Sequence, residues 1–228
     1  MAIDRNAARG IGSRATWLVA GACLGALALA GTARAAEPPA GKQAGTFMVR
    51  ARLLDVIPLN STSSVSGIGG KVAAGSAITP ELDFSYFLTD NIALELIAAT
   101  SRHSVKVKGS ALGDVSVGKV WVLPPALTLQ YHFMPKSQFS PYVGAGLNYT
   151  VFYNAKPAGG AVTKLAFENN VGGVLQAGLD YNITGHTFLN VDVKQFFLNT
   201  TAKVNGGAIK AKTALNPTVV GVGIGYRF

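Results

Sequence analysis

Eight segments of alternating apolar and polar residues follow one another along this chain, and they constrain its fold more than any other feature. Successive residues of a strand point to opposite faces, so a period of two predicts strands. No run of 18 or more apolar residues occurs after residue 36, which excludes a helical membrane protein. The segments are 46–57, 76–88, 91–103, 117–133, 140–153, 167–181, 187–200 and 214–228.

The connections between these segments alternate in length. Those after the first, third, fifth and seventh segments are long and rich in Gly, Ser and Lys, whereas the others are short and contain turn formers. Long loops at one end and tight turns at the other are the layout of an outer-membrane barrel. We therefore expect an all-β fold, an eight-stranded antiparallel up-and-down transmembrane β-barrel, with both chain ends on the periplasmic, short-turn side. The long connections are 59–75, 104–116, 154–166 and 201–213, and the short ones are 89–90, 134–139 and 182–186.

Each segment has one apolar face and one polar or small face. In the third segment Ile92, Leu94 and Leu96 share one face, and Glu95 and Ile97 share the other. A soluble barrel of the lipocalin type would turn the apolar face inward, whereas a membrane barrel turns it toward lipid. Aromatic residues near segment ends favour the membrane barrel, since such residues form girdles at membrane interfaces. They are Phe47, Phe87, Tyr131, Phe133, Tyr149, Tyr153, Tyr181 and Tyr226.

The first 35 residues have the three parts of a secretory signal peptide. Basic residues precede an apolar run of 14 residues, 17–30, and the small-residue site 33–35 predicts cleavage before Ala36. The run is shorter than the roughly 20 residues of a membrane anchor. Residues 36–45 are then a periplasmic segment and 46–228 the barrel. The only cysteine, Cys23, lies in the leader, so we expect neither a disulfide nor a thiolate-bound metal in the mature protein.

Part of the excess of basic over acidic residues lies in that leader. The formal net charge is +9, and it falls to +6 after cleavage because 16 basic and ten acidic residues remain. No basic stripe is interleaved with aromatic residues, which argues against nucleic-acid binding. Contact with lipopolysaccharide is the simpler interpretation of the excess.

Many polar residues fall on the predicted inward face. The interior of an eight-stranded barrel is filled by side chains, and open channels need about 16 strands, so a general diffusion porin is disfavoured. We expect these groups to pair with one another as a plug, because unpaired buried charges are costly; a proton or ion relay is the alternative. The set is Arg50, Arg52, Glu81, Asp83, Glu95, Gln130, His132, Gln176, Asp180, Asp192, Lys194 and Arg227.

Four stretches resemble the OmpW family of small outer-membrane barrels. Residues 89–103 begin TDNIALELIAAT, 123–125 read LPP, 141–150 read PYVGAGLNYT and 225–228 read GYRF. Together these stretches span most of the chain after the leader, and their order and spacing make the resemblance specific. The last strand also ends in alternate large residues, Ile224, Tyr226 and Phe228, which resemble the terminal signal read by the outer-membrane assembly machinery.

The resemblance implies a narrow hydrophobic lumen that passes small hydrophobic molecules across the Gram-negative outer membrane, with an exit sideways through the wall. It places Ile97 at an apolar constriction, and Lys194 where the family can carry a large aromatic residue. It implies no cofactor and leaves the oligomeric state open. An adhesion or receptor barrel acting through its long loops, toward host, phage or toxin, is the alternative. Candidate entrance residues in the loops are Val65, Ile68, Val72, Phe152 and Leu165.

Enzyme signatures are weak in this chain. Residues 113–119 read G-x-x-x-x-G-K, but Val120 replaces the Ser or Thr that a phosphate-binding loop requires. His103 beside Ser104 is the best candidate for a hydrolase or acyltransferase, although nothing near it in sequence suggests an orienting acid. We expect no catalytic residue and no metal site, and we interpret Gly221, Gly223 and Gly225 as keeping the lumen side of the last strand uncrowded.

Overall fold

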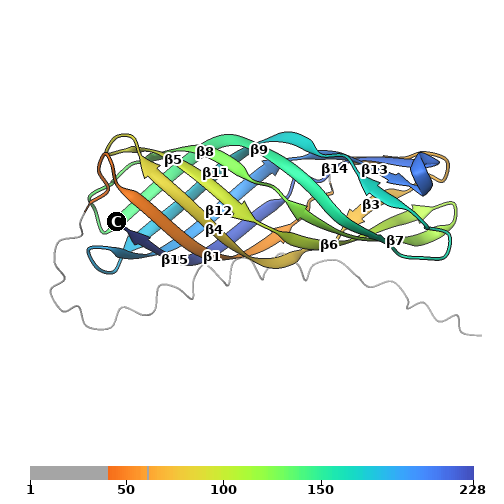
Figure 1. Ribbon diagram of the computed structural model, residues 1–228, viewed down its shortest axis with the longest axis horizontal. Helices are drawn as coiled ribbons and strands as arrows, with labels where there is room; N and C mark the ends of the chain where they lie inside the picture. The colour runs from red at the N-terminus through yellow and green to blue at the C-terminus, as the bar shows by residue number, and fades with distance from the viewer. Residues whose placement is uncertain (1–40, 61) are drawn as a thin grey trace, which may run out of the picture. The chain divides into compact units, whose positions relative to one another are not determined.

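A computed structural model describes residues 41–60 and 62–228 of the chain (Figure 1). The predicted signal peptide, its cleavage before Ala36 and the first part of the predicted periplasmic segment lie outside the described residues. No helix in the described part is both long enough and apolar enough to cross a membrane.

Eight strands of the described residues close into a barrel, as the sequence predicts. Each is antiparallel to its neighbours in the order β1-β4-β5-β8-β9-β11-β12-β15, and β15 pairs with β1 to complete the ring. Short turns join β4 to β5, β8 to β9 and β11 to β12, at the end where β1 begins and β15 ends (Figure 1). The strands are β1 (Phe47–Ile57), β4 (Ala77–Phe87), β5 (Ile92–Ala99), β8 (Ala126–His132), β9 (Phe139–Pro157), β11 (Asn170–Asn182), β12 (Thr187–Phe197) and β15 (Thr218–Arg227).

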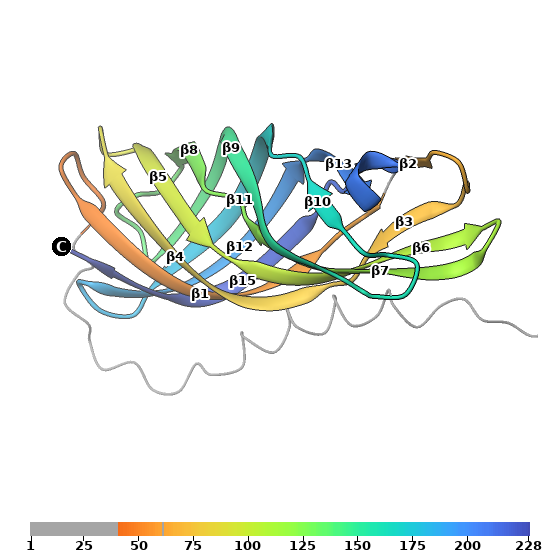
Figure 2. The same cartoon turned by 45° about the vertical axis from the view of Figure 1, so that its right-hand side comes forward.

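The long connections are themselves mostly strands, contrary to the expectation of loops. They form an extension of the barrel wall at the end opposite the short turns (Figures 1 and 2). The reason is visible in the sequence, because Lys-rich pieces such as 104–108 keep a period of two, with Val105 and Val107 buried and Lys106 and Lys108 exposed. The added elements are β2 (Thr62–Val65), β3 (Lys71–Ala74), β6 (Ser101–Ser110), β7 (Gly113–Leu123), β10 (Leu165–Phe167), β13 (Asn199–Val204), a short 3-10 turn (Asn205–Gly207) and β14 (Ile209–Ala214).

The extension consists of two four-stranded walls. One has the order β3-β6-β7-β9 and the other β10-β13-β14-β2. Within the described residues no strand ladder joins β2 to β3 or β9 to β10. The ladder between β9 and β11 ends at the pair Thr150–Asn170, and β10 lies beyond that end. Side chains close these two seams: Asn60 exchanges hydrogen bonds with the backbone of Ala74 on one side, and the Phe152 N–H donates to Asn169 Oδ1 at 3.0 Å on the other.

The two faces predicted from the alternation are the two faces of the barrel wall. Leu94, Leu96 and Leu129 point outward and are 37–52% exposed, whereas Glu95 and Ile97 are buried inside. Phe87 is a correction to the predicted girdle. Its side chain is fully buried, packed against His132 with ring centroids 4.9 Å apart, because it shares the inward period of β4.

Aromatic side chains border the outward apolar surface at both ends. Tyr131 and Phe133 contact each other at the short-turn end, and Trp121 and Tyr153 stack at 6.2 Å where the extension begins. Aromatic belts of this kind lie at the headgroup level of a bilayer. The apolar surface between them is therefore the lipid-facing band.

A charge in the middle of this band should destabilise the barrel. Because Leu129 lies between the two belts, Leu129→Arg should lower the free energy of unfolding by about 2–4 kcal/mol. Denaturant titration in lipid vesicles measures the change. Leu112→Arg, at an exposed turn of the extension, is the matched control and should change stability by less than about 0.5 kcal/mol. Equal effects of the two substitutions would contradict the assignment of the band.

A candidate site: an ion-pair plug beneath an apolar cavity

Charged residues on β1, β4 and β5 meet inside the barrel because the strand register places them side by side. Arg50 lies directly opposite Asp83, and Arg52 lies opposite Glu81. The Arg50 guanidinium lies 2.6 Å from Asp83 and 2.7 Å from Glu95, and Arg52 contacts the same two carboxylates at 2.5 and 2.7 Å. Two guanidinium groups thus share two carboxylates, all fully buried.

Residues of β12 extend this network across the bore. Lys194 lies 3.0 Å from Glu81 and 2.7 Å from Asp192, and Arg52 also reaches Asp192 at 3.0 Å. Lys194 therefore belongs to the charge network and does not line the cavity described below. Its place in the constriction remains a prediction.

Lys42 completes the network from the periplasmic side, and the sequence did not single it out. Its side chain is fully buried, and its ammonium group donates to Asp180 at 2.7 Å and to Ser140 at 2.7 Å, with His132 Nδ1 at 2.9 Å. Lys42 precedes β1 in the segment expected to be periplasmic, where no period marks an inward face. An unpaired inward Asp180 would have been the only signal pointing to a missing cation.

Neutral polar side chains contact further groups of the network. Gln176 donates to Asp192 at 2.9 Å, and Tyr142 donates its hydroxyl to the same carboxylate at 2.8 Å. His132 Nε2 lies 3.1 Å from Gln130. Arg227 lies apart from the ion pairs and donates to Asn182 at 2.7 Å.

We call the ten charged side chains the plug. Every one is at most 3% exposed. Five are basic and five are acidic, so the charges balance, as they must where no water screens them. All twelve inward polar residues predicted from the sequence have buried side chains. The plug comprises Lys42, Arg50, Arg52, Lys194, Arg227, Glu81, Asp83, Glu95, Asp180 and Asp192.

Glycines on the inward face of β15 make room for the plug. A Cβ atom on Gly225 would collide with the ring of Phe188 and lie 2.8 Å from Cγ of Arg50. On Gly223 it would collide with the backbone of Ala51 and crowd the Arg52 side chain. The glycine run therefore keeps this side of the bore uncrowded, as expected from the sequence.

The inward face changes from charged to apolar at one level on several strands. Two residues toward the extracellular end, Arg52 is followed by Leu54, Glu95 by Ile97, and Lys194 by Phe196. An apolar cavity of ≈ 70 Å³ lies above the plug, and Glu81 is part of its lining. Ile97 also lines it, as do residues of the extension that include Val72, Val120, Val122, Phe152 and Phe167.

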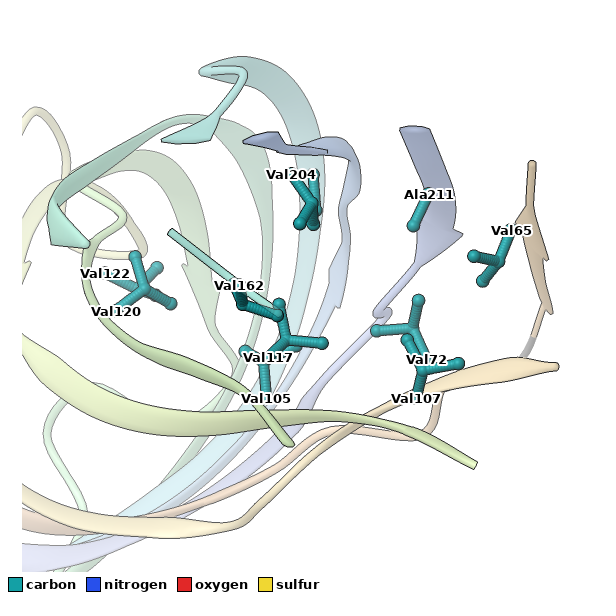
Figure 3. Packing of buried hydrophobic residues seen from close by; sticks show 11 residues of the cluster. Val65, Val72, Val105, Val107, Val117, Val120, Val122, Val162, Val204 and Ala211 are labelled. Atoms are coloured by element: carbon teal, nitrogen blue, oxygen red, sulfur yellow. The ribbon is translucent and has the colours of Figure 1, made fainter. Parts of the chain in front are cut away.

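Beyond the cavity the extension is filled by buried valine and alanine, which we call the valine cluster (Figure 3). Of the five predicted entrance residues, Val72 and Phe152 line the cavity. Val65 is a member of the cluster, and Ile68 and Leu165 pack against it. The cluster comprises Val65, Val72, Val105, Val107, Val117, Val120, Val122, Val162, Ala202, Val204 and Ala211.

The His103 and Ser104 pair of the hydrolase alternative is not assembled. Both lie in β6, so their side chains point to opposite faces: His103 is buried and lines the cavity, and Ser104 is exposed outside. The ring nitrogens of His103 are engaged by Ser101 at 2.8 Å and by the Gly75 carbonyl at 2.7 Å. In residues 41–60 and 62–228, no group of three His, Cys, Asp or Glu is arranged to hold a metal ion.

The three large residues at the end of the chain point outward. Ile224, Tyr226 and Phe228 are 46–69% exposed, and the Phe228 ring lies 6.0 Å from that of Phe47. Their recognition by the assembly machinery stays a prediction.

Breaking the plug should be far more damaging than breaking a surface ion pair. Asp83→Leu removes one of the two carboxylates that Arg50 and Arg52 share, and we expect a loss of about 3–5 kcal/mol in the free energy of unfolding. The control is Asp90→Asn, which removes an exposed pair with Lys136 and should leave the unfolding midpoint nearly unchanged. Denaturant titration of both variants in the same detergent is the measurement, and similar midpoints would refute the structural role of the plug.

Comparisons with known proteins agree with this architecture. A family model described as the OmpW family matches residues 43–228. An uncharacterized outer-membrane protein of Sinorhizobium fredii, y4mB, is 42% identical and covers 94% of this chain and 98% of its own. Outer membrane protein W of Vibrio cholerae is 34% identical over 86% of this chain and 94% of its own. The crystal structure of OprG from Pseudomonas aeruginosa superposes with a TM-score of 0.77 at 30% identity, covering 83% of this chain and 99% of that one.

Proposed function

This chain belongs to the OmpW family of outer-membrane barrels, and on that premise we propose that it takes small hydrophobic molecules from outside the cell into the cavity above its plug. The observation that carries the proposal is the change of the lumen from charged to apolar at one level. Apolar solutes partition into such a lining, whereas ions and sugars would lose their hydration there.

The plug argues against a straight path through the barrel. Its ion pairs span the bore, as between Lys194 of β12 and Glu81 of β4, and opening a straight path would separate buried charges from their partners. A solute that enters the cavity therefore needs another exit. The sideways exit that the family resemblance implies avoids the plug altogether.

The seam between β9 and β10 is the best candidate for that exit. Phe152 and Phe167 stack across it with ring centroids 5.4 Å apart, and both rings line the cavity. Because side chains close the seam in place of a backbone ladder, rotating two rings requires far less free energy than parting two paired strands. Tyr153 of the aromatic belt is next in sequence to Phe152, so a solute leaving here would enter the lipid near the membrane surface.

The cavity is small at ≈ 70 Å³, compared with roughly 300–1,000 Å³ for pockets that hold drug-sized ligands. A solute must therefore displace lining side chains as it enters. This favours slim, flexible apolar molecules over bulky or rigid ones.

Filling the cavity should abolish uptake without unfolding the barrel. Ala99 lines the cavity, and its neighbour Ala98 points outward. The variants are expressed in a strain that lacks this protein, and uptake of a radiolabelled apolar solute is measured. With Ala99→Trp, uptake should be no higher than in the strain without any protein supplied. Ala98→Trp, which adds the same side chain on the lipid side, should restore uptake as the unchanged protein does. Full uptake through Ala99→Trp would exclude the cavity as the route.

Locking the seam tests the exit separately. The expected mature chain contains no cysteine, so Phe152→Cys/Phe167→Cys offers a single pair for oxidation. Oxidation should block uptake, and reduction of the same cells should restore it. Either single variant, which has no partner thiol, serves as the control and should not respond to oxidant. Uptake that continues after confirmed disulfide formation would place the exit elsewhere.

A further inference from the structure

The outer surface of the wall β3-β6-β7-β9 carries six exposed basic residues, which we call the basic face. All six are exposed, and most are next in sequence to buried valines of the valine cluster, so these side chains point away from the lumen. The strands of this wall contribute one acidic residue, Asp114, and its carboxylate already accepts the N–H of Gly109 at 2.9 Å. The basic face consists of Lys71, Arg102, Lys106, Lys108, Lys119 and Lys156.

Two pairs of like charges lie directly opposite each other on the basic face. Lys71 is the cross-strand partner of Lys108, and Lys119 is the partner of Lys156. Side chains so placed have Cβ atoms about 4.5–5.5 Å apart, and like charges there are destabilising. In the part of the chain that the structure describes, no carboxylate forms an ion pair with any residue of the basic face.

In the other wall of the extension, a carboxylate of the chain itself offsets the repulsion between two opposed lysines. Lys203 also lies opposite a lysine, Lys210, but Glu168 pairs with Lys203 at 2.6 Å. The same ammonium group holds the pKa of the Glu168 carboxyl below its usual value. The basic face has no counterpart to Glu168, so its compensating negative charge has to come from outside the chain.

The basic face begins at the level of the aromatic belt. The pair Lys119–Lys156 is next along the ladder to the pair Trp121–Tyr153, and the Arg102 guanidinium lies 5.9 Å from the Trp121 ring centroid. Aromatic belts mark the headgroup level of a membrane. From Arg102 to Lys108 the strand rises about 20 Å at about 3.3 Å per residue. The basic face thus runs from the headgroups outward.

We infer that the basic face binds the phosphate groups of lipopolysaccharide. Arg102, Lys119 and Lys156 lie where the phosphates of the lipid anchor are found, immediately above the acyl chains. Lys71, Lys106 and Lys108 lie farther out, at the level of the acidic inner sugars. Lysine and arginine bind phosphate through charge-assisted hydrogen bonds, and these would offset the repulsion within the two lysine pairs. This role is independent of the cavity and of transport.

A soluble sulfated polysaccharide would match the charge of the basic face but not its position. Such a ligand has no reason to lie against the aromatic belt, whereas a lipid phosphate is held at that level by its own acyl chains. The continuity of Lys119 and Lys156 with Trp121 and Tyr153 therefore favours the lipid.

The double variant Lys119→Gln/Lys156→Gln separates binding from folding. The full mature chain, refolded in detergent without lipopolysaccharide, is titrated with purified deep-rough lipopolysaccharide, and the dissociation constant and the thermal unfolding midpoint are followed. The double variant should bind about 30-fold more weakly, given roughly 1 kcal/mol for each lysine near an anionic membrane surface. Without lipopolysaccharide it should be at least as stable as the unchanged protein, because a repulsion has been removed.

The matched control is Lys203→Gln/Lys210→Gln, which removes the same charge from a lysine pair away from the basic face. It should change the dissociation constant less than threefold. An equal loss in the two double variants would overturn the inference in favour of a general charge effect. So would equal binding of dephosphorylated lipopolysaccharide, or heparin binding that is tighter than lipopolysaccharide binding and depends on the same two lysines.

Discussion

The requirement that buried charges find partners governs the interior of this barrel. An eight-stranded ring leaves room for side chains only, so inward charges are removed from water, and most of them lie within a few ångströms of an opposite charge. Arg50 and Arg52 lie on β1, and their partners come from other strands: carboxylates from β4 and β5, a carboxylate and an ammonium group from β12, and an amide from β11. The glycines of β15 belong to the same requirement, since the long guanidinium side chains occupy the space that their Cβ atoms would need.

The molecule is layered along the barrel axis. The plug is at the periplasmic half, the apolar cavity lies above it, and the valine cluster fills the extension. The boundary between plug and cavity is one inward position wide on these strands, since Leu54, Ile97 and Phe196 are each two residues beyond a charged side chain. The outer surface has its own sequence of layers, from aromatic belt through lipid-facing leucines to a second belt and then lysines.

The period of two was sufficient to predict the strands, the two faces and the inward polar residues, because these are local properties of the chain. It could not give their partners, since pairs such as Lys194 with Glu81 depend on the register of strands far apart in sequence. The inward position of Lys42 could not be predicted from the period either, because Lys42 lies outside any periodic segment. For Phe87 the position near a strand end predicts the girdle, whereas its period of two gives the correct inward face. The strands of the extension have the Lys, Gly and Ser content of loops, although valine and lysine alternate within them.

The seam at which β15 meets β1 joins residues from the two ends of the described part of the chain. Arg50 and Arg52 stand on one side of that join, and Asp192 and Lys194 on the strand next beyond it. A ring that is still open at this seam leaves these groups accessible to water, whereas the closed ring buries them. We therefore expect pairing of β15 with β1 and dehydration of the lumen to be coupled, because a partly closed ring buries little of the network.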